Sequence, residues 1–322
     1  MRAIRVDGYG GPEVLVPVEE PDPVAGDGEV VVRAEAIDTI FVETQIRGGW
    51  GEAFGITPPY VPGGAAAGVV VATGPGVDPS WTGRRVLAGA GTRGTYAELV
   101  RTGVDRLVPV PEGLGPREAA ALAHDGVTGI GIAEAAGITP GDRVLVLGAA
   151  GGMGTLLVQL AHAAGARLVG AARGEQKLAL VKRLGADAVV DYSADGWTDD
   201  VREAFGGQPV DVLLDGVGGE LGARAFTLVA DGGRVSAHGA SSGGFAELDE
   251  ESARARGITL RGIADVQFGA SDVVRLATKA LAEAAAGRLR PVIAREFPLS
   301  RAADAHRAIE ARSIPGKALL IP

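Results

Sequence analysis

The sequence predicts a mixed α/β protein built from two domains, and three observations support this fold class. The chain has 322 residues, which exceeds the roughly 150 residues of one average domain. In residues 1–115, short apolar runs alternate with clusters of Gly, Pro and Asp, which is typical of an all-β barrel or sandwich. From Asp142 onward, short strands alternate with helical segments, which indicates a doubly wound parallel sheet.

The β-rich part is expected to contain short strands that are bounded by turn-forming residues. They are predicted at 29–34, 68–72, 84–88, 96–100 and 106–110. The following stretch, 115–137, is rich in alanine and begins near Pro116, a residue that suits the first turn of a helix. This stretch therefore predicts a helical bridge into the second part of the chain.

The second part begins with a fully apolar segment, 144–147, as expected for a parallel strand buried on both faces. After a glycine-rich turn, Met153, Leu156, Leu157 and Leu160 fall on one face of an amphipathic helix. Further strands are predicted at 168–171, 188–190, 210–214, 233–236, 259–262 and 318–321, and helices at 176–184, 273–287 and 300–311.

Composition and charge exclude several classes of function. The chain has no cysteine, which excludes disulfides, thiol catalysis and cysteine-ligated zinc. Its four histidines are widely spaced, so we expect no metal site. The formal net charge of −9 disfavours binding to nucleic acid or to an anionic membrane. Because a long apolar segment and a secretory signal are both lacking, we expect the protein in the cytoplasm.

The glycine-rich turn at 148–154 predicts a dinucleotide site. It joins a buried strand to an amphipathic helix, and its glycines allow a diphosphate to approach the backbone at the positive end of the helix dipole. Ala149 stands at the first glycine of the G-x-G-x-x-G fingerprint, so the match is A-x-G-x-x-G. The alternative is a purely structural glycine turn.

The residues after the second predicted strand favour NADPH over NADH. An NAD site usually has an acidic residue there that binds the ribose diol. This chain has Arg173, with Lys177 one helical turn further on, and cations suit a 2′-phosphate. Glu175 lies nearby, and the two basic residues could instead be solvated surface charges.

Several short motifs, in their order and spacing, resemble those of zinc-independent medium-chain dehydrogenases/reductases, most closely the quinone oxidoreductases. The matching segments are 46–49, 60–64, 67–68, 83–86, 94–98, 119–122, 126–128, 149–154, 298–299, 305–307 and 316–322. Zinc-dependent relatives carry Gly-His-Glu at a position where this chain has Gly63, Gly64 and Ala65. The resemblance therefore implies an oxidoreductase that works without zinc.

The resemblance implies a GroES-like β-barrel catalytic domain, residues 1–124 and 266–322, and a Rossmann domain, residues 125–265. In such relatives the dimer is the common assembly. The residues implied to bind NADPH are Ala150, Gly151, Gly152, Met153, Gly154, Arg173, Lys177, Tyr192, Val217, His238, Gly239, Ala240, Phe268 and Lys317. Alternatives stay open for three of them: Tyr192 could close a strand, Phe268 could belong to the core, and Lys317 could be solvated.

Three residues are candidates for catalysis. The resemblance places Thr128 near the nicotinamide. It also implies that Gln45 lies near the substrate, because the segment around Gln45 aligns with one that lies near the substrate in relatives. His124 precedes Thr128 by one helical turn and has a side chain suited to proton donation, although it could serve only in packing. The pocket itself departs from the family pattern, since Ile40, Glu43 and Gln45 stand where relatives often have Asn, Asp and Tyr.

The expected activity is hydride transfer from NADPH to a quinone or an α,β-unsaturated carbonyl. Without zinc, only hydrogen bonds polarise the acceptor, which suits a conjugated acceptor that spreads the developing charge. One alternative is an enoyl-thioester reductase of polyketide or fatty-acid metabolism, for which we find no basic groove. Another is a non-catalytic NADPH-binding protein, which the altered pocket permits.

Overall fold

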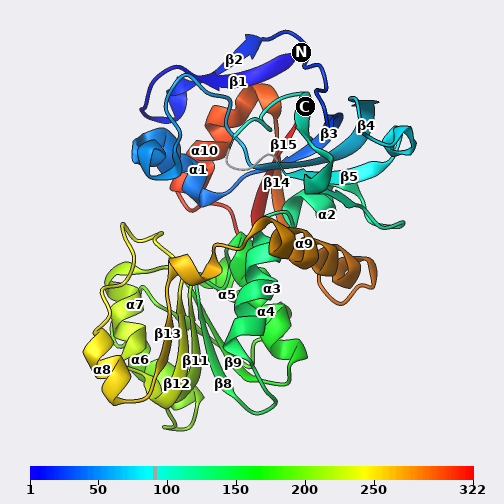
Figure 1. Ribbon diagram of the computed structural model, residues 1–322. Coiled ribbons are helices and arrows are strands. Elements are labelled where there is room, and N and C mark those ends of the chain that lie inside the picture. Colours follow the sequence, from blue (N-terminus) through cyan, green and yellow to red (C-terminus); the bar gives the residue numbers. More distant parts are fainter. Residues whose placement is uncertain (90–92) are drawn as a thin grey trace. The chain divides into compact units, whose positions relative to one another are not determined.

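The computed structural model describes residues 1–89 and 93–322 (Figure 1). Contacts between residues divide the described chain into two compact units. The first unit comprises Met1–Val127 and Ala270–Pro322, and the second comprises Thr128–Gly269. The boundaries between the units therefore lie after Val127 and after Gly269. The family resemblance predicted domain boundaries after residues 124 and 265.

The second unit, all of whose residues are described, contains a six-stranded parallel sheet in the order β10-β9-β8-β11-β12-β13. The chain starts at the centre with β8, moves outward to β10, and then crosses to β11 and the opposite edge. This order defines a doubly wound dinucleotide-binding sheet and confirms the prediction. Its strands are β8 (Arg143–Leu147), β9 (Arg167–Ala172), β10 (Ala188–Asp191), β11 (Val210–Asp215), β12 (Val229–Ala237) and β13 (Thr259–Arg261).

Helices cover both faces of this sheet (Figure 1). Because side chains alternate along a strand, Val144 and Val146 point to the face of one core cluster, and Leu145 and Leu147 to that of another. Trp197 is fully buried in the second cluster. The helices are α3 (Asp125–Ala136), α4 (Gly152–Ala163) and α5 (Glu175–Arg183) on one face, and α6 (Trp197–Ala204), α7 (Gly219–Phe226) and α8 (Glu250–Ala255) on the other.

Among the described residues of the first unit, seven strands form a second sheet, around the long strand β3 (Glu29–Asp38). One edge of β3 pairs with β4, and the other pairs first with β6 and then, at Ile37 and Asp38, with β15. The partners in this sheet are β4 (Ala65–Thr73), β5 (Arg85–Gly89), β6 (Leu99–Gly103), β7 (Leu107–Pro109), β14 (Ile293–Pro298) and β15 (Lys317–Ile321).

One core cluster of the first unit packs side chains of this sheet with those of two helices, α1 (Phe41–Gly48) and α10 (Ala302–Glu310). Ile37, Ile46 and Leu320 are among its buried side chains. The unit also contains α2 (Pro116–Ala121) and α9 (Ala270–Ala285), together with the 3-10 turns η1 (Pro12–Val14), η2 (Trp50–Phe54), η3 (Pro79–Trp81), η4 (Val104–Arg106) and η6 (Leu299–Arg301). A further 3-10 turn, η5 (Ile263–Val266), belongs to the second unit.

Two expectations for the first unit were wrong or incomplete. The strand predicted at 96–100 begins only at Leu99, because Tyr96 and Ala97 pair with the N-terminal strand: the N–H of Ile4 donates to the Tyr96 carbonyl over 2.8 Å. That N-terminal hairpin, β1 (Arg2–Val6) and β2 (Leu15–Glu19), was not predicted. Pro17 breaks the strand pattern of β2, and it is tolerated because, within residues 1–89 and 93–322, β2 pairs with β1 alone.

Candidate active site

The residues expected to bind the cofactor follow the carboxyl ends of the parallel strands. In a parallel sheet these ends share one edge, which is where open α/β sheets bind ligands. The glycine turn follows β8, Arg173 follows β9 and Tyr192 follows β10. Val217 comes two residues after β11, and His238 comes directly after β12. The sheet topology therefore gathers five separate predicted segments at one edge of the second unit.

The glycine turn fits a diphosphate. A Cβ added at Gly154 would overlap with the carbonyl oxygen of Gly148 and lie 2.9 Å from the carbonyl carbon of Ala149, so only glycine lets α4 pack against the turn. Gly151 is exposed, and a Cβ there would meet only the Gly148 oxygen, at 3.4 Å, among the described residues. No described side chain caps the start of α4, which leaves its first N–H groups for an anion.

The remaining residues of the turn differ in how deeply they are buried. Ala150 is buried, whereas Gly152 and Met153 are half-buried in the first turn of α4. Ala149 is fully buried and faces Gly170 of β9, where an added Cβ would lie 3.3 Å from the Ala149 methyl group. Ala149 therefore fills space between neighbouring strands, which explains how alanine can occupy the first position of the fingerprint.

Arg173 and Tyr192 follow strands that are paired in register, since Ala172 of β9 lies opposite Asp191 of β10. Arg173 is exposed, and both Tyr192 and Lys177 are half-buried. Although burial acts in the opposite direction, hydrogen bonds from Ser193 and Gly174 and the positive charge of Arg173 lower the pKa of Asp191. The carboxylate next to Arg173 is therefore ionised and already bound to backbone N–H groups.

The loops after β11 and β12 pack tightly on each other. A Cβ at Gly239 would overlap with the backbone of Gly216, and the N–H groups of His238 and Gly239 both donate to the carbonyl oxygen of Asp215, at 3.1 and 2.9 Å. Val217 is buried, and a Cβ at Gly148 would lie 3.1 Å from its side chain. Ala240, the next residue in the chain, is half-buried.

His238 is held neutral. Its Nδ1 lies 3.1 Å from the Ser236 hydroxyl, and Nε2 is buried without a hydrogen-bond partner among the described residues. Burial lowers the pKa of His238 to about 4. Phe268, the other residue expected near the nicotinamide, is half-buried against the core and its ring fills the space left by Gly131 in α3.

A buried cluster of charges lies in the first unit. Oδ2 of Asp38 accepts a hydrogen bond from Nδ1 of His124 over 2.6 Å. Oδ1 of Asp38 forms an ion pair with Nζ of Lys317 over 2.6 Å, at an angle outside hydrogen-bond geometry. Nζ of Lys317 also donates to Oδ2 of Asp125 over 3.0 Å. Asp38 and Lys317 are 1% and 4% exposed. The buried ammonium group of Lys317 therefore contacts two carboxylates, those of Asp38 and Asp125.

The register of the sheet creates this cluster. Asp38 ends β3 opposite Leu319 of β15, so Lys317, two residues away on the same face, is its diagonal neighbour. His124 and Asp125 stand at the start of α3. Sequence analysis missed Asp38 and Asp125; the available signals were a carboxylate that ends an apolar strand and an acidic residue adjacent to a candidate histidine.

The charges in the cluster set one another's protonation. Although burial acts in the opposite direction, Lys317 and His124 lower the pKa of Asp38. Burial also opposes the ionised form of Lys317, but the charges of Asp125 and Asp38 raise its pKa. Burial, aided by the charge of Asp38, raises the pKa of Asp125 despite the opposing effect of Lys317. His124, against the effect of burial, has its pKa raised by its hydrogen bond with Asp38.

The other candidates for catalysis are less constrained. Thr128 is half-buried in α3. Gln45 is half-buried in α1, where its side-chain amide donates to the Thr44 hydroxyl over 3.1 Å. Glu43 of the same helix is buried instead, and accepts hydrogen bonds from the N–H of Ile40 and the hydroxyl of Tyr96. The structure thus shows Gln45, but not Glu43, in partial contact with solvent.

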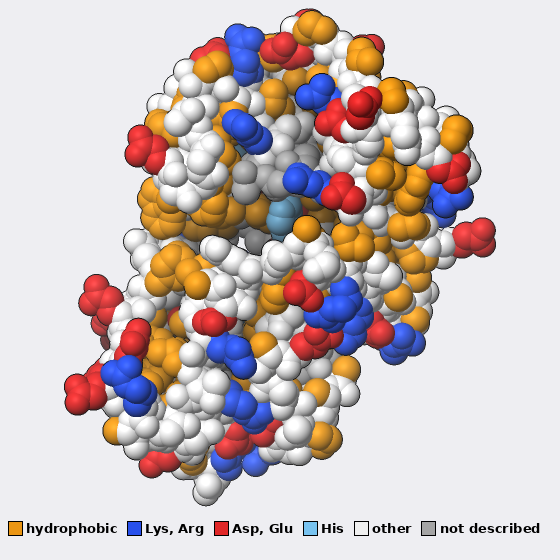
Figure 2. Space-filling model, in the orientation of Figure 1, with side chains coloured by type: hydrophobic (Ala, Val, Ile, Leu, Met, Phe, Trp, Pro, Cys, Tyr) orange, Lys and Arg blue, Asp and Glu red, His pale blue; other side chains and the backbone are white. Residues whose placement is uncertain are grey.

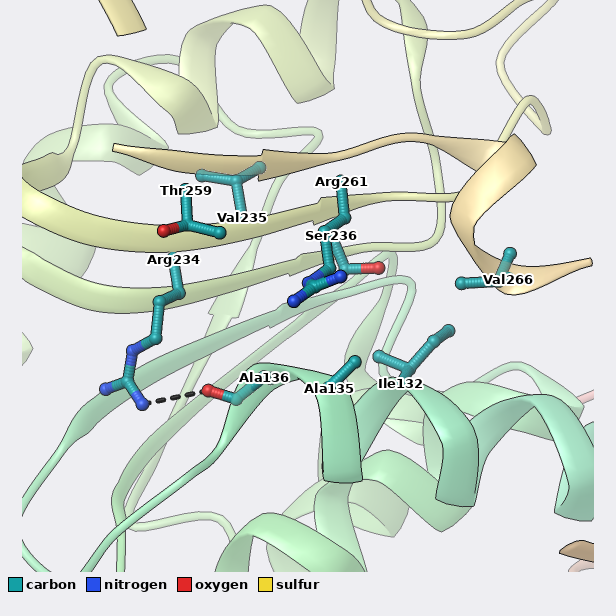
Figure 3. A pocket seen from close by; sticks show the side chains of 9 residues that line it. All are labelled: Ile132, Ala135, Ala136, Arg234, Val235, Ser236, Thr259, Arg261 and Val266. Carbon is teal, nitrogen blue, oxygen red and sulfur yellow. Dashed lines mark hydrogen bonds between the residues drawn. The ribbon is translucent and has the colours of Figure 1, made fainter. Parts of the chain in front are cut away.

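A small pocket of the second unit lies between α3 and the strands β12 and β13 (Figure 3). Its volume is about 10 Å³, room for one water molecule. Arg234 and Arg261 line it beside apolar side chains such as Ile132 and Val266. None of the residues expected to bind NADPH lines this pocket, in the part of the chain that the structure describes. It is therefore separate from the predicted cofactor site.

The surface carries no broad region of one sign on the face shown in Figure 2, where acidic and basic side chains are interspersed. Many arginines form ion pairs with nearby carboxylates, as Arg288 does with Glu283 over 2.6 Å. Over residues 1–89 and 93–322, no helix is long and apolar enough to cross a membrane. Over the same residues, no group of three or more His, Asp or Glu side chains is arranged to hold a metal ion.

The parallel sheet and its glycine turn define a dinucleotide-binding protein, and comparisons with known proteins identify its family. Residues 26–112 match the model of the alcohol dehydrogenase GroES-like domain, and residues 152–283 match that of the zinc-binding dehydrogenases. The chain is 31% identical to the quinone oxidoreductase of Sus scrofa, over 100% of this chain and 98% of that protein. It belongs to the quinone oxidoreductase-like medium-chain dehydrogenases/reductases and is an oxidoreductase.

Two further relatives are informative. The 2-haloacrylate reductase of a Burkholderia species is 31% identical, over 97% of this chain and 96% of that protein. The solved structure of a mycobacterial protein complexed with NADPH has a TM-score of 0.91 and 32% identity, and the match covers both chains fully. The predicted fold class, a GroES-like domain with a Rossmann domain, is confirmed by the family models and by this structural similarity.

Proposed function

We propose that this protein uses NADPH to reduce a quinone or an α,β-unsaturated carbonyl compound. The observation that carries the proposal is the diphosphate cradle, in which Gly154 packs on Gly148 and leaves the start of α4 uncapped by the described side chains. A bound NADPH supplies the hydride. Two relatives support the acceptor class, since one is named for quinones and the other for a haloacrylate, which is a conjugated acid.

The chain's own residues have two tasks in this reaction. The turn at 148–154 binds the diphosphate through backbone N–H groups, and Gly239 and Ala240 line the cofactor with backbone atoms. Thr128, Gln45 and His124 are the proposed catalytic residues, which orient the acceptor or donate a proton to it. For an enone the balance is one hydride to the β-carbon and one proton to the oxygen or α-carbon.

We propose NADPH rather than NADH because Arg173 and Tyr192 follow adjacent strands and Lys177 follows in the first turn of α5. Cations at this edge suit a 2′-phosphate dianion. In addition, we propose a cytoplasmic homodimer, in which the outer strand β13 supplies a sheet edge with a single neighbour, β12. Lys317 and Phe268 remain proposed neighbours of the cofactor by family resemblance alone.

The test is steady-state oxidation of NADPH, followed at 340 nm, with separate panels of quinones, enones, acrylates and enoyl thioesters. We expect turnover with quinones or simple enones. Preferential turnover of enoyl thioesters would instead indicate the carrier-linked reductase. Tight NADPH binding without any turnover would indicate a binding protein, and an absence of NADPH binding would contradict the proposal as a whole.

A further inference from the structure

The cluster formed by Asp38, His124, Asp125 and Lys317 has an unusual charge balance. Two ionised carboxylates and one ammonium group sum to −1, and a protonated His124 brings the total to zero. A buried charge without a counter-charge is costly, so a neutral total is favoured. Glu43 also acts on His124 and, when ionised, adds further negative charge. The geometry therefore favours a proton on the imidazole ring.

The hydrogen bond with Asp38 decides which proton can leave. Nδ1 donates to Oδ2 of Asp38 in both the neutral and the charged ring, provided that the neutral ring keeps its proton on Nδ1. The proton that distinguishes the two states is then the one on Nε2. Asp38 is 1% exposed, whereas the side chain of His124 is 31% exposed. The ring is therefore fixed on its Nδ1 side by a buried group and retains contact with the outside.

We propose that Asp38 is a positioning residue that holds His124 as an imidazolium, that Lys317, itself bound by Asp125, fixes Asp38 in place, and that His124 is the acid that protonates the reduced acceptor. The inference rests on the proposed reductase function and assigns its proton donor. Thr128, which follows His124 by one helical turn, is the residue expected near the nicotinamide. The acceptor is then a compound whose oxygen gains a proton as the conjugated carbon or quinone ring gains hydride.

The step is balanced. As hydride reaches the acceptor, the N–H bond at Nε2 of His124 breaks and an O–H bond forms on the acceptor oxygen, giving an enol from an enone or the keto tautomer of a hydroquinone from a quinone. The electron pair of the broken bond stays on Nε2, which leaves neutral imidazole still bonded to Asp38. Water then returns a proton to Nε2. The cluster carries −1 only during this interval, and Lys317 limits the excess negative charge around Asp38.

The first experiment titrates the histidines of the full chain by NMR. Burial lowers the pKa of His238 to about 4 and that of His306 to about 3, so we expect their signals to move little over pH 5–9. We expect His124, assigned by the signal lost in His124→Gln, to titrate above the ordinary histidine value of about 6.5. Asp38→Asn should lower that midpoint by about one unit or more, and Lys317→Met should raise it.

Opposite shifts of the His124 midpoint in Asp38→Asn and Lys317→Met would show that the two charges act on the imidazole ring. If the two residues were merely structural, the direction of the shift would not depend on the sign of the removed charge. If Lys317→Met does not fold, Asp38→Asn alone decides the outcome. A midpoint for His124 at or below 6.5 in the unmodified protein would overturn the proposal. So would a midpoint that Asp38→Asn leaves unchanged.

The second experiment measures turnover. His124→Gln should lower kcat by roughly 100-fold while the Kd for NADPH stays unchanged, since loss of a general acid typically costs 10²–10⁴-fold. The control is His162→Gln, which removes an exposed histidine of α4 and should leave kcat as it was. In Asp38→Asn, the basic limb of the kcat profile should move to lower pH together with the NMR midpoint.

Failure of this inference can be told apart from failure of the proposed function. If the unmodified protein reduces no acceptor, the proposed function is wrong, and the role of His124 as donor is wrong with it, whatever its midpoint. If the unmodified protein turns over and His124→Gln keeps half or more of kcat across the pH range, only the assignment of the proton donor is wrong.

Discussion

The hydroxyl group of Tyr96 donates a hydrogen bond to Oε2 of Glu43 over 2.7 Å, and both side chains are buried. The same oxygen accepts the N–H of Ile40 over 3.0 Å. Because the phenol proton points to Glu43, the proton of His306 on Nε2 donates to the phenol oxygen over 3.0 Å. The remaining nitrogen, Nδ1, is then the one without a hydrogen-bond partner among the described residues.

This arrangement makes Glu43 a group whose charge changes near neutral pH. Burial raises its pKa to about 7, and the charge of Asp38 adds to the effect although the hydrogen bonds oppose it. A glutamate in the unfolded chain has a pKa of about 4.3. The folded state therefore binds more protons than the unfolded state between those values, and stability falls as the pH rises through this window.

Glu43→Gln should remove this pH dependence. The full contribution is on the order of 3 kcal/mol, present below the unfolded pKa and lost above about pH 7. We expect the variant to gain stability relative to the unmodified protein between pH 5 and pH 8, measured by urea unfolding at both values. Glu52→Gln changes an exposed glutamate nearby in the sequence and is the matched control. Parallel curves for Glu43→Gln and the unmodified protein would contradict the raised pKa.

The glycine turn gives a second prediction, in which two similar substitutions act differently. Gly154→Ala would place a methyl group against the backbone of Gly148 and should cost about 1–3 kcal/mol of stability as well as NADPH affinity. Gly151→Ala has room for its methyl group, and its φ of −77° suits any residue. We expect Gly151→Ala to keep its stability within about 0.5 kcal/mol and still lose NADPH affinity by tenfold or more.

Thermal unfolding and NADPH fluorescence titration measure these two effects separately. Gly244→Ala, in open space on the loop after β12, serves as a control for the substitution itself. If Gly151→Ala bound NADPH as tightly as the unmodified protein, the diphosphate would not approach the turn as we propose.

The contrast between the two units shows what the sequence could predict. In the second unit, most strands contain a short apolar run next to a helical segment, so local pattern and final fold agree, and topology alone brings the segments at 148–154, Arg173 and Tyr192 to one edge. The cluster of Asp38 and Lys317 could not be predicted in this way. It depends on the pairing of β3 with β15, two strands separated by most of the chain, and no local pattern encodes that register.

Arg173→Ala tests the choice of coenzyme. Removal of a cation that binds a 2′-phosphate should weaken NADPH binding by tenfold or more and leave NADH binding within twofold, because only NADPH carries that group. Arg183→Ala removes the same charge at the opposite end of α5, where the side chain is exposed, and is the matched control. Isothermal titration with both coenzymes measures the ratio. Equal losses for both coenzymes, or no loss for either, would refute the proposed role of Arg173.

The last prediction concerns Lys317, which the structure buries between Asp38 and Asp125. Lys317→Met leaves two buried carboxylates without their cation, so it should cost about 3–5 kcal/mol in unfolding free energy. Removal of one carboxylate should relieve part of that cost. The double variant Asp38→Asn with Lys317→Met should therefore be more stable than the sum of the two single effects predicts, by about 1 kcal/mol or more.

The same variants decide whether Lys317 also binds the cofactor. If its ammonium group serves only the cluster, the folded double variant should bind NADPH as the unmodified protein does, measured by titration below its unfolding temperature. Asp22→Asn, which removes the carboxylate paired with the N-terminal amine at the surface, is the control for a merely exposed ion pair and should leave the unfolding free energy nearly unchanged. Strict additivity would show that Lys317 and Asp38 do not stabilise each other. A tenfold loss of NADPH affinity in the double variant would support Lys317 as a neighbour of the cofactor, as the family resemblance implies.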